Sequence, residues 1–411
     1  MKEEVKKVLF LFTNEFPCSK TLEPYLEHEI PYLASAFEKV IIVPATLNAI
    51  QKQIPTNVEV INIFDKNWFN SSTSSKIGVI PQFIKFYITE KLDKDSKSRL
   101  KIKNIVTDYK SFYNAVITGR ALESFADTNH LKLSYASFYS YWFFHPVLTL
   151  AILKKKGKID SFISRGHLGD IYLDQYPELS NFYNYKIKNV SKLLLISAHA
   201  KDYVDKLYPA LKEKFIISRL AVSDMSINPM PKDEFVLVSC STYSERKRVD
   251  LLAKLLCNAP FPITWYHFGY VPPDVLKRFD DDFSESKAPI KAIYKGDVPN
   301  NLVMDFYKTN AVNVIVNLST SEGLPFSLIE ANSFGIPVIA TNVNGTPDIA
   351  TVKNGFLLPI NFQSSLFYDC LVNIRNAGDG LRKGARELYY RDYNAKNNYA
   401  EVIGHLKEQT I

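Results

Sequence analysis

Short apolar runs alternate with amphipathic stretches along most of this chain. Val8–Phe12, Val40–Val43 and Lys192–Ser197 are such runs in the first half, and Phe235–Cys240 and Val338–Thr341 are such runs in the second. Runs this short and this apolar are typical of strands that are buried on both faces, and parallel neighbours need helical crossovers between them. The pattern therefore predicts an α/β fold built on parallel sheets.

The length and one polar interruption indicate two domains. A chain of 411 residues is too long for one ordinary core and fits two domains of about 200 residues each. Ser223–Glu234, which contains two prolines, interrupts the alternation and is typical of a linker. The stretch from about 65 to 130 is weakly patterned and lysine-rich, and we expect a helical insertion there.

Composition excludes several classes of protein. Hydrophobic residues make up 46% of the chain, which is too many for a disordered protein. No apolar run approaches the roughly 20 residues that cross a bilayer, and the start has no signal-peptide cleavage site. The four cysteines form no C-x-x-C pair, which argues against a disulfide scaffold or a zinc ribbon. We expect a soluble, cytoplasmic protein.

The positive charge is concentrated in the first half of the chain. Residues 1–220 contain 31 lysines and arginines against 22 acidic residues, whereas residues 221–411 contain 19 against 21. One interpretation is a face turned toward anionic lipid or a phosphate-bearing substrate, and the other is a set of solvated lysine-rich helices. No compact arginine-rich stripe is present, so nucleic acid is not an expected partner.

One loop of the second half combines an anion site with two carboxylates. Ser321–Glu330 follows the expected strand Val312–Leu318, and a helix begins within it. Free N–H groups at a helix start bind anions, while Glu322 and Glu330 suit hydroxyl groups, which donate hydrogen bonds. This combination fits a nucleotide-sugar. Alternatively, Glu330 forms a capping box with Ser327.

The same loop carries a family resemblance. Seven residues separate Glu322 from Glu330, and the chain continues with Glu330–Thr341, Asn344–Asp348 and Gly355–Pro359. This series resembles the donor-domain signature of the family 4 retaining glycosyltransferases. The resemblance implies the GT-B fold, which has two Rossmann-like, doubly wound parallel-sheet domains facing a cleft, with the acceptor in the first and the nucleotide-sugar in the second.

The resemblance also sets the expected domain limits. The acceptor-binding domain would span residues 1–222, and the donor-binding domain would span residues 223–387. A closing helix at about 388–411, in which Leu388–Leu406 resembles the family's last element, would cross back to the first domain.

The resemblance implies a donor site around the two glutamates. The expected donor-binding residues are Arg246, Lys247, Val298, Glu322, Gly323, Leu324, Pro325, Phe326, Ser327, Leu328 and Glu330. Lys247 lies among three adjacent cations after the strand Phe235–Cys240, where a diphosphate leaving group could be neutralised. By themselves these cations also fit a solvated cluster. The family's usual upstream arginine is replaced by Thr242 or Ser241, and Arg246 would compensate.

A histidine after a first-domain strand completes the implied catalytic set of His167, Glu322 and Lys247. His167 follows the run Ser161–Ser164 and resembles the family histidine that contacts the transferred sugar. Arg165 and Asp170 are expected beside it on the acceptor side, either to bind the acceptor or to orient the histidine ring. Glu23, in an N-terminal loop that lacks the family's glycines, is the further acceptor-side candidate.

The resemblance implies retaining transfer of a hexose from a nucleoside diphosphate, a UDP-sugar in preference to a GDP-sugar. The acceptor would be a glycan or a polyprenyl-diphosphate-linked glycan, because Ser140–Trp142 and Trp265–Gly269 are similar to segments of bacterial capsule, O-antigen and exopolysaccharide enzymes. No cofactor and no metal are expected, since Asp280–Asp282 fits a solvated loop. The basic first domain is compatible with docking on the inner face of the plasma membrane. The alternatives are a nucleotide-sugar epimerase or hydrolase on the same fold, and a non-catalytic nucleotide-sugar-binding protein.

Overall fold

The computed structural model describes residues 7–19, 23–50, 52–64, 67–92, 105–176 and 182–408. The chain divides into two compact units. Unit 1 comprises residues 1–196, 200–218 and 399–411, and unit 2 comprises residues 197–199 and 219–398. The division thus falls four residues before the boundary expected at 222/223, and the chain re-enters unit 1 at Tyr399 rather than at about 388.

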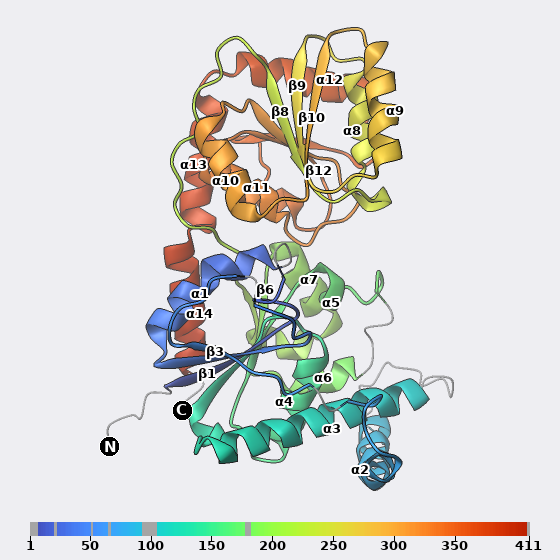
Figure 1. The fold of residues 1–411 in the computed structure, drawn as a ribbon, viewed down its shortest axis with the longest axis vertical. Coiled ribbons are helices and arrows are strands. Elements are labelled where there is room, and N and C mark those ends of the chain that lie inside the picture. The colour runs from blue at the N-terminus through green and yellow to red at the C-terminus, as the bar shows by residue number, and fades with distance from the viewer. Residues whose placement is uncertain are drawn as a thin grey trace. The chain divides into compact units, whose positions relative to one another are not determined.

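Unit 1 is built on a parallel sheet with the strand order β3-β2-β1-β4-β5-β6-β7. Its described strands are β1 (Val8–Thr13), β2 (Lys39–Pro44), β3 (Val58–Val60), β4 (Ala136–Ser140), β5 (Ile163–Gly166), β6 (Lys192–Leu195) and β7 (Phe215–Ile217). Its helices are α1 (Pro24–Ala36), α2 (Thr73–Leu92), α3 (Ile105–Thr128), α4 (His145–Lys155), α5 (Leu168–Ile171), α6 (Tyr183–Asn189), most of α7 (Ala198–Leu207) and the end of α14 (Ala395–Lys407). Figure 1 shows the helical insertion of α2 and α3, which confirms the helices expected between 65 and 130.

Unit 2 repeats this architecture with the parallel order β10-β9-β8-β11-β12-β13. Its described strands are β8 (Val236–Cys240), β9 (Ile263–Phe268), β10 (Ile290–Gly296), β11 (Val314–Asn317), β12 (Val338–Thr341) and β13 (Gly355–Leu358). Its helices are α8 (Val249–Leu256), α9 (Pro273–Ser284), α10 (Asn300–Thr309), α11 (Phe326–Ser333), α12 (Ser364–Asn376) and α13 (Gly380–Asp392), with short 3₁₀ turns η5 (Glu245–Lys247) and η6 (Thr346–Asp348).

The expected strands form because helices cover both faces of each sheet (Figure 1). In β1 every residue after Val8 is buried, and in β12 all four residues are buried. Both units place their first strand next to their fourth, so the strand order reverses between β1 and β4 and between β8 and β11. Ligands of open parallel sheets bind beyond the carboxyl ends of the strands at such a reversal.

Three sequence-based expectations need correction. The closing helix is not continuous, because α13 ends at Asp392 and α14 starts at Ala395. The backbone groups of Tyr393 and Ala395 bond to Val222 instead of continuing a helical ladder. Asp280–Asp282 lies in helix α9 rather than in a loop. The strand expected over Val312–Leu318 spans only Val314–Asn317.

The end of α14 nevertheless belongs to unit 1. Ser137 in β4 donates a hydrogen bond to the carbonyl oxygen of Leu406 at 3.0 Å. No helix in the described part of the chain is both long enough and apolar enough to cross a membrane.

Candidate active site

A hollow opens at the strand-order reversal of unit 2. Its lining residues come from the carboxyl ends of β8 and β11 and from the start of α8: Ser239, Cys240, Ser241, Lys247, Arg248, Val249, Leu252, Val316, Asn317, Leu318 and Ser319. Strands β8 and β11 are hydrogen-bonded neighbours, so their ends lie side by side. The position is the one at which a doubly wound sheet binds its ligand.

Lys247 and Glu322 meet at this hollow. The Lys247 Nζ lies 2.5 Å from the Glu322 Oε1, and the Arg246 Nη1 lies 3.5 Å from the Oε2. The amide of Asn317, the last residue of β11, also donates to the Glu322 Oε1 at 3.3 Å. The structure thus brings together three residues that sequence reasoning placed in one site, although 75 positions separate Lys247 from Glu322.

The charges around Glu322 keep its carboxyl group ionised. Burial by itself raises the pKa of Glu322, but the charge and hydrogen bond of Lys247, with smaller contributions from Ser319 and Arg246, more than reverse this effect. The pKa of Glu322 therefore lies below its ordinary value. A buried carboxylate at a ligand site can accept hydrogen bonds from hydroxyl groups.

The loop that carries Glu322 is held by a close backbone crossing. Gly345 donates its N–H to the carbonyl oxygen of Glu322 at 3.3 Å. A Cβ at Gly345 would lie 1.9 Å from the carbonyl oxygen of Gly323, so only glycine fits this crossing. Gly323, Leu324 and Pro325 are buried below the start of α11.

Helix α11 starts at Phe326, which removes the capping-box alternative. Its N-cap is Pro325, no side chain caps it, and Ser327 and Glu330 lie inside the helix. The backbone N–H of Leu328 donates to Pro325 at 3.0 Å, so that amide is already satisfied. Phe326 and Ser327 are half-buried at the helix start, where the helix dipole favours an anion.

Glu330 lies deeper than Glu322 and pairs with helix α10. The Asn300 Nδ2, at the first residue of α10, donates to the Glu330 Oε1 at 2.6 Å. Val298 is half-buried two residues before Asn300, so it lies on the same connection. Burial and the charge of Glu330 raise the pKa of Cys240, at the end of β8, to about 12. The thiol of Cys240 is therefore protonated and is not a nucleophile at neutral pH.

In unit 1, His167 stands at the carboxyl end of β5 among aromatic rings. Its ring centroid lies 4.1 Å from that of Trp142 and 5.3 Å from that of Tyr141. The side chain is buried, its Nδ1 lies 3.9 Å from the Asp170 Oδ2, and its Nε2 has no hydrogen-bond partner among the described residues. Burial, only partly opposed by Asp170, lowers the pKa of His167, so the ring is neutral at pH 7. A neutral imidazole with an unused N–H is suited to bind a sugar hydroxyl.

Asp170 and Glu23 organise loops in this structure. The Asp170 carboxylate accepts the backbone N–H of His167 at 2.5 Å and that of Phe143 at 2.7 Å, which joins the loops after β4 and β5. The Glu23 carboxylate accepts the indole N–H of Trp142 at 2.5 Å and three backbone N–H groups of residues 14–16. Both carboxylates are buried. The contacts of Asp170 fit the orienting role that was one of its two expected roles, and those of Glu23 hold the loop of residues 14–16.

Arg165 is likewise a buried structural residue. Its Nε donates to the hydroxyl of Tyr139 and its Nη1 to the carbonyl oxygen of Ser218, both at 2.7 Å. Its Nη2 lies 3.5 Å from Glu29, and neither side chain of this pair is exposed. With all three guanidinium nitrogens engaged, Arg165 ties the sheet to α1 instead of presenting its charge to an acceptor.

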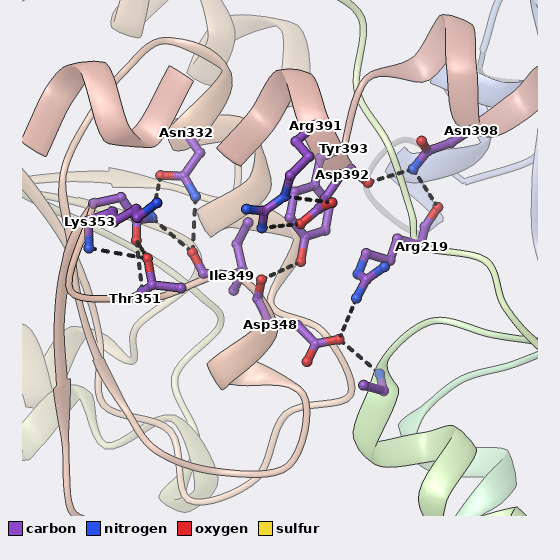
Figure 2. Close-up of polar contacts among 12 residues, drawn as sticks. Arg219, Asn332, Asp348, Ile349, Thr351, Lys353, Arg391, Asp392, Tyr393 and Asn398 are labelled. Atoms are coloured by element: carbon purple, nitrogen blue, oxygen red, sulfur yellow. Dashed lines mark hydrogen bonds and ion pairs between the residues drawn. The ribbon is translucent and has the colours of Figure 1, made fainter. Parts of the chain in front are cut away.

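Asp348, which ends the signature segment Asn344–Asp348, has a structural role in unit 2 (Figure 2). The Asp348 Oδ2 accepts the backbone N–H of Ala198 at 2.8 Å and lies 3.4 Å from the Arg219 Nη2. The hydroxyl of Tyr393 donates to the Asp348 carbonyl oxygen at 2.8 Å. Asn398 donates to the carbonyl oxygen of Arg219 at 3.3 Å, so the network fixes both ends of unit 2.

The described residues contain no group of three or more histidine, cysteine, aspartate or glutamate side chains placed to hold a metal ion. Two asparagines at the site were missed from the sequence. Asn317 ends an apolar strand and Asn300 opens a helix, and a polar residue at such a position is the signal that could have identified them.

The fold and this site define the class of the protein. The two α/β units, with parallel sheets in matching strand order, constitute the GT-B fold. The lipopolysaccharide outer core galactosyltransferase WaaB, in its apo form, aligns with a TM-score of 0.65 and 15% identity over 97% of this chain and 99% of that one. Anabaena HepE in complex with UDP aligns with a TM-score of 0.66 and 14% identity over 98% and 100% of the two chains.

The sequence comparison assigns one domain of the chain to a family. Residues 223–367 match the family model described as glycosyl transferases group 1, and the chain therefore carries a domain of that family. An Escherichia coli protein named UDP-Gal:alpha-D-GlcNAc-diphosphoundecaprenol alpha-1,3-galactosyltransferase is 32% identical over 109 residues. That match spans about a quarter of either protein, 26% of this chain and 26% of the relative.

Proposed function

We propose that this protein is a retaining, family 4 glycosyltransferase that moves a hexose from a UDP-sugar to a lipid-linked glycan in bacterial surface polysaccharide synthesis. The observation that carries the proposal is the Lys247–Glu322 pair, which lies at the strand-order reversal of a glycosyl transferases group 1 domain. Glu330, held by Asn300, supplies the second carboxylate of the same site.

Each group has a role that its chemistry supports. Lys247, assisted by Arg246 and the α11 start, would neutralise the departing diphosphate. Removing one such donor typically costs about 2.7–4 kcal/mol of transition-state stabilisation, or roughly 10²–10³ in kcat. Glu330 would accept the ribose hydroxyls, and Glu322 would accept sugar hydroxyls near the cationic transition state.

We infer retention from the family resemblance, and the donor site favours one route to it. Among its described residues, Cys240 is protonated and Glu322 is engaged by Lys247, which disfavours a covalent glycosyl-enzyme intermediate. We propose attack on the same face from which the diphosphate leaves, with the leaving phosphate accepting the proton of the acceptor hydroxyl. His167 would hold the transferred sugar through its unused ring N–H.

The proposed substrates rest on the relatives. HepE was solved with UDP, which supports UDP over GDP, and the Escherichia coli relative is named for an acceptor on diphosphoundecaprenol. We accordingly propose an acceptor carried on a polyprenyl diphosphate and a site of action at the cytoplasmic face of the membrane. No metal is proposed for the reaction.

The test is a transfer assay on the purified full chain. UDP-, GDP- and ADP-hexoses are offered with a short-chain lipid-diphosphate-linked N-acetylglucosamine, with magnesium or with EDTA, and the anomeric configuration is read by NMR. We expect a UDP-sugar to be consumed with retention, unaffected by EDTA. Lys247→Ala is expected to lower kcat about 10²-fold or more, while Lys254→Ala, an exposed lysine on α8, serves as the matched control.

Three outcomes would contradict the proposal. An inverted product would exclude same-face attack. Consumption of the donor at an undiminished rate without acceptor would indicate an epimerase or hydrolase. Binding of UDP without turnover of any sugar would indicate a nucleotide-sugar-binding protein.

A further inference from the structure

Helix α2 of unit 1 is apolar on two faces. Its buried face packs Val79 and Phe83 against the core, and the Phe83 ring lies 5.6 Å from that of Phe112 in α3. The same helix exposes four isoleucines, Ile77 at 59%, Ile80 at 39%, Ile84 at 50% and Ile88 at 52%. We call these four residues the isoleucine stripe.

The stripe is continuous along one side of the helix. Residues at spacings of three and four share a helix face, so Ile77, Ile80, Ile84 and Ile88 follow one another on the surface of α2. The helix has 20 residues and is therefore about 30 Å long. Surface helices of water-soluble proteins normally present polar residues on the face away from the core, so an apolar second face indicates a contact surface.

The charges on α2 indicate what the stripe contacts. The helix contains three lysines and one glutamate. Lys85 is exposed next to Ile84, and the Lys76 Nζ lies 4.9 Å from the ring centroid of Trp68. An apolar stripe flanked by lysines matches the boundary between the acyl chains and the anionic headgroups of a bilayer.

A second copy of the chain fits this surface less well. The exposed surface of the four isoleucines equals that of about two fully exposed isoleucine residues. This area is well below the roughly 800 Å² that each partner buries in a standard protein interface. Two α2 helices of the same positive charge would also repel each other. The excess of positive charge in residues 1–220 extends the same preference for an anionic partner.

We propose that the isoleucine stripe of α2 docks unit 1 on an anionic lipid bilayer. The isoleucines would enter the acyl boundary while Lys76 and Lys85 stay at headgroup level. The proposed function gives this docking its purpose, since a polyprenyl-diphosphate acceptor is held in the membrane. The binding itself requires neither donor nor acceptor, so it is measured separately from transfer.

The test is co-flotation of the full chain with vesicles of phosphatidylcholine alone or mixed equally with phosphatidylglycerol, at low and high salt. We expect binding to the anionic vesicles, reduced by salt. Ile84→Glu/Ile88→Glu is expected to reduce it about tenfold or more. The matched control is Ile227→Glu/Val352→Glu, in unit 2, which adds the same two charges at residues that are 68% and 91% exposed and should leave binding unchanged.

Two further measurements keep the outcomes distinct. The increase in Tm that UDP causes in each variant reports whether unit 2 remains folded and binds a nucleotide. If UDP stabilises none of the proteins, the proposed function fails while the docking proposal is unaffected. Light scattering reports self-association. Equal vesicle binding by the double variant and the wild type would overturn the proposal. It would also be overturned if the wild type bound no vesicles and formed a dimer that the double variant does not form.

Discussion

Replacing Lys247 by methionine should destabilise unit 2 in a way that depends on Glu322. The pair is largely buried, with side-chain exposures of 18% and 8%. Removing one partner of a buried ion pair costs about 3–5 kcal/mol. Arg246 and Asn317 still face the carboxylate in the variant, so we expect a smaller loss than this, about 2–3 kcal/mol in the free energy of unfolding.

The stability of the wild type and that of the variant should depend on pH in opposite directions, because the pKa of Glu322 shifts in opposite directions in the two proteins. The folded pKa of Glu322 lies below its ordinary value near 4.5, so its contribution to stability is complete above that pH and is lost as the pH falls through the folded pKa. Without Lys247, burial becomes the larger effect and the folded pKa rises. The variant should then lose stability as the pH rises above 4.5, the reverse of the wild-type slope.

The assay is thermal and urea unfolding of four proteins: wild type, Lys247→Met, Glu322→Gln and the double variant. For a domain of this size, 2–3 kcal/mol corresponds to a decrease of about 4–12 °C in Tm. Lys254→Met, which removes an exposed lysine of α8, controls for loss of charge. If Lys247→Met costs the same in the Glu322→Gln background, within about 0.5 kcal/mol, the two residues are not coupled and the reasoning is refuted.

Three other predictions follow from the packing. Gly345→Ala should abolish stabilisation by UDP, because its Cβ would lie 1.9 Å from the carbonyl oxygen of Gly323; an unchanged UDP-induced Tm shift would show that the crossing is dispensable. Arg165→Met should lower the free energy of unfolding by about 3–5 kcal/mol, because Glu29 loses its cation. Adding Glu29→Gln should recover part of this free energy in urea unfolding, whereas no recovery would exclude the ion pair as the cause. His167→Ala should lower kcat without altering the UDP-induced Tm shift, and a lost shift would place His167 in nucleotide binding instead.

Much of the fold could be predicted from local pattern. The strand expected at Val338–Thr341 is confirmed to the residue, because strands buried on both faces are rich in apolar residues and stand out from their polar flanks. The GT-B architecture is also confirmed. The division of the last helix was missed, although Asn394 is a residue type preferred at helix starts. Its side-chain oxygen accepts the backbone N–H of Lys396 at 3.0 Å, and the backbone of Val222 pairs with Tyr393 and Ala395 at the break.

The candidate site was predicted in part. Strand ends in a parallel sheet converge on one edge, and this rule, together with the family resemblance, associated Lys247 with Glu322, whose side chains lie 2.5 Å apart. Their roles in catalysis stay a prediction. The rule says nothing about whether a side chain at that edge faces a ligand or the protein. Arg165 and Glu23 come from strand ends or the loops after them, as the rule requires, and yet their side-chain nitrogens and oxygens are engaged inside unit 1.

The sequence by itself determined which elements form and which ends of the strands carry chemistry, because hydrophobic periodicity and turn residues are local properties of the chain. Only the tertiary structure decided which charged side chains pair with other groups of the protein and which face a ligand. A buried carboxylate such as Asp170 or Glu322 takes its role from the donors around it, and those donors come from segments far away in the sequence. The isoleucine stripe of α2 belongs to the same category, since the sequence shows both apolar faces of that helix and the fold shows which of them is left uncovered.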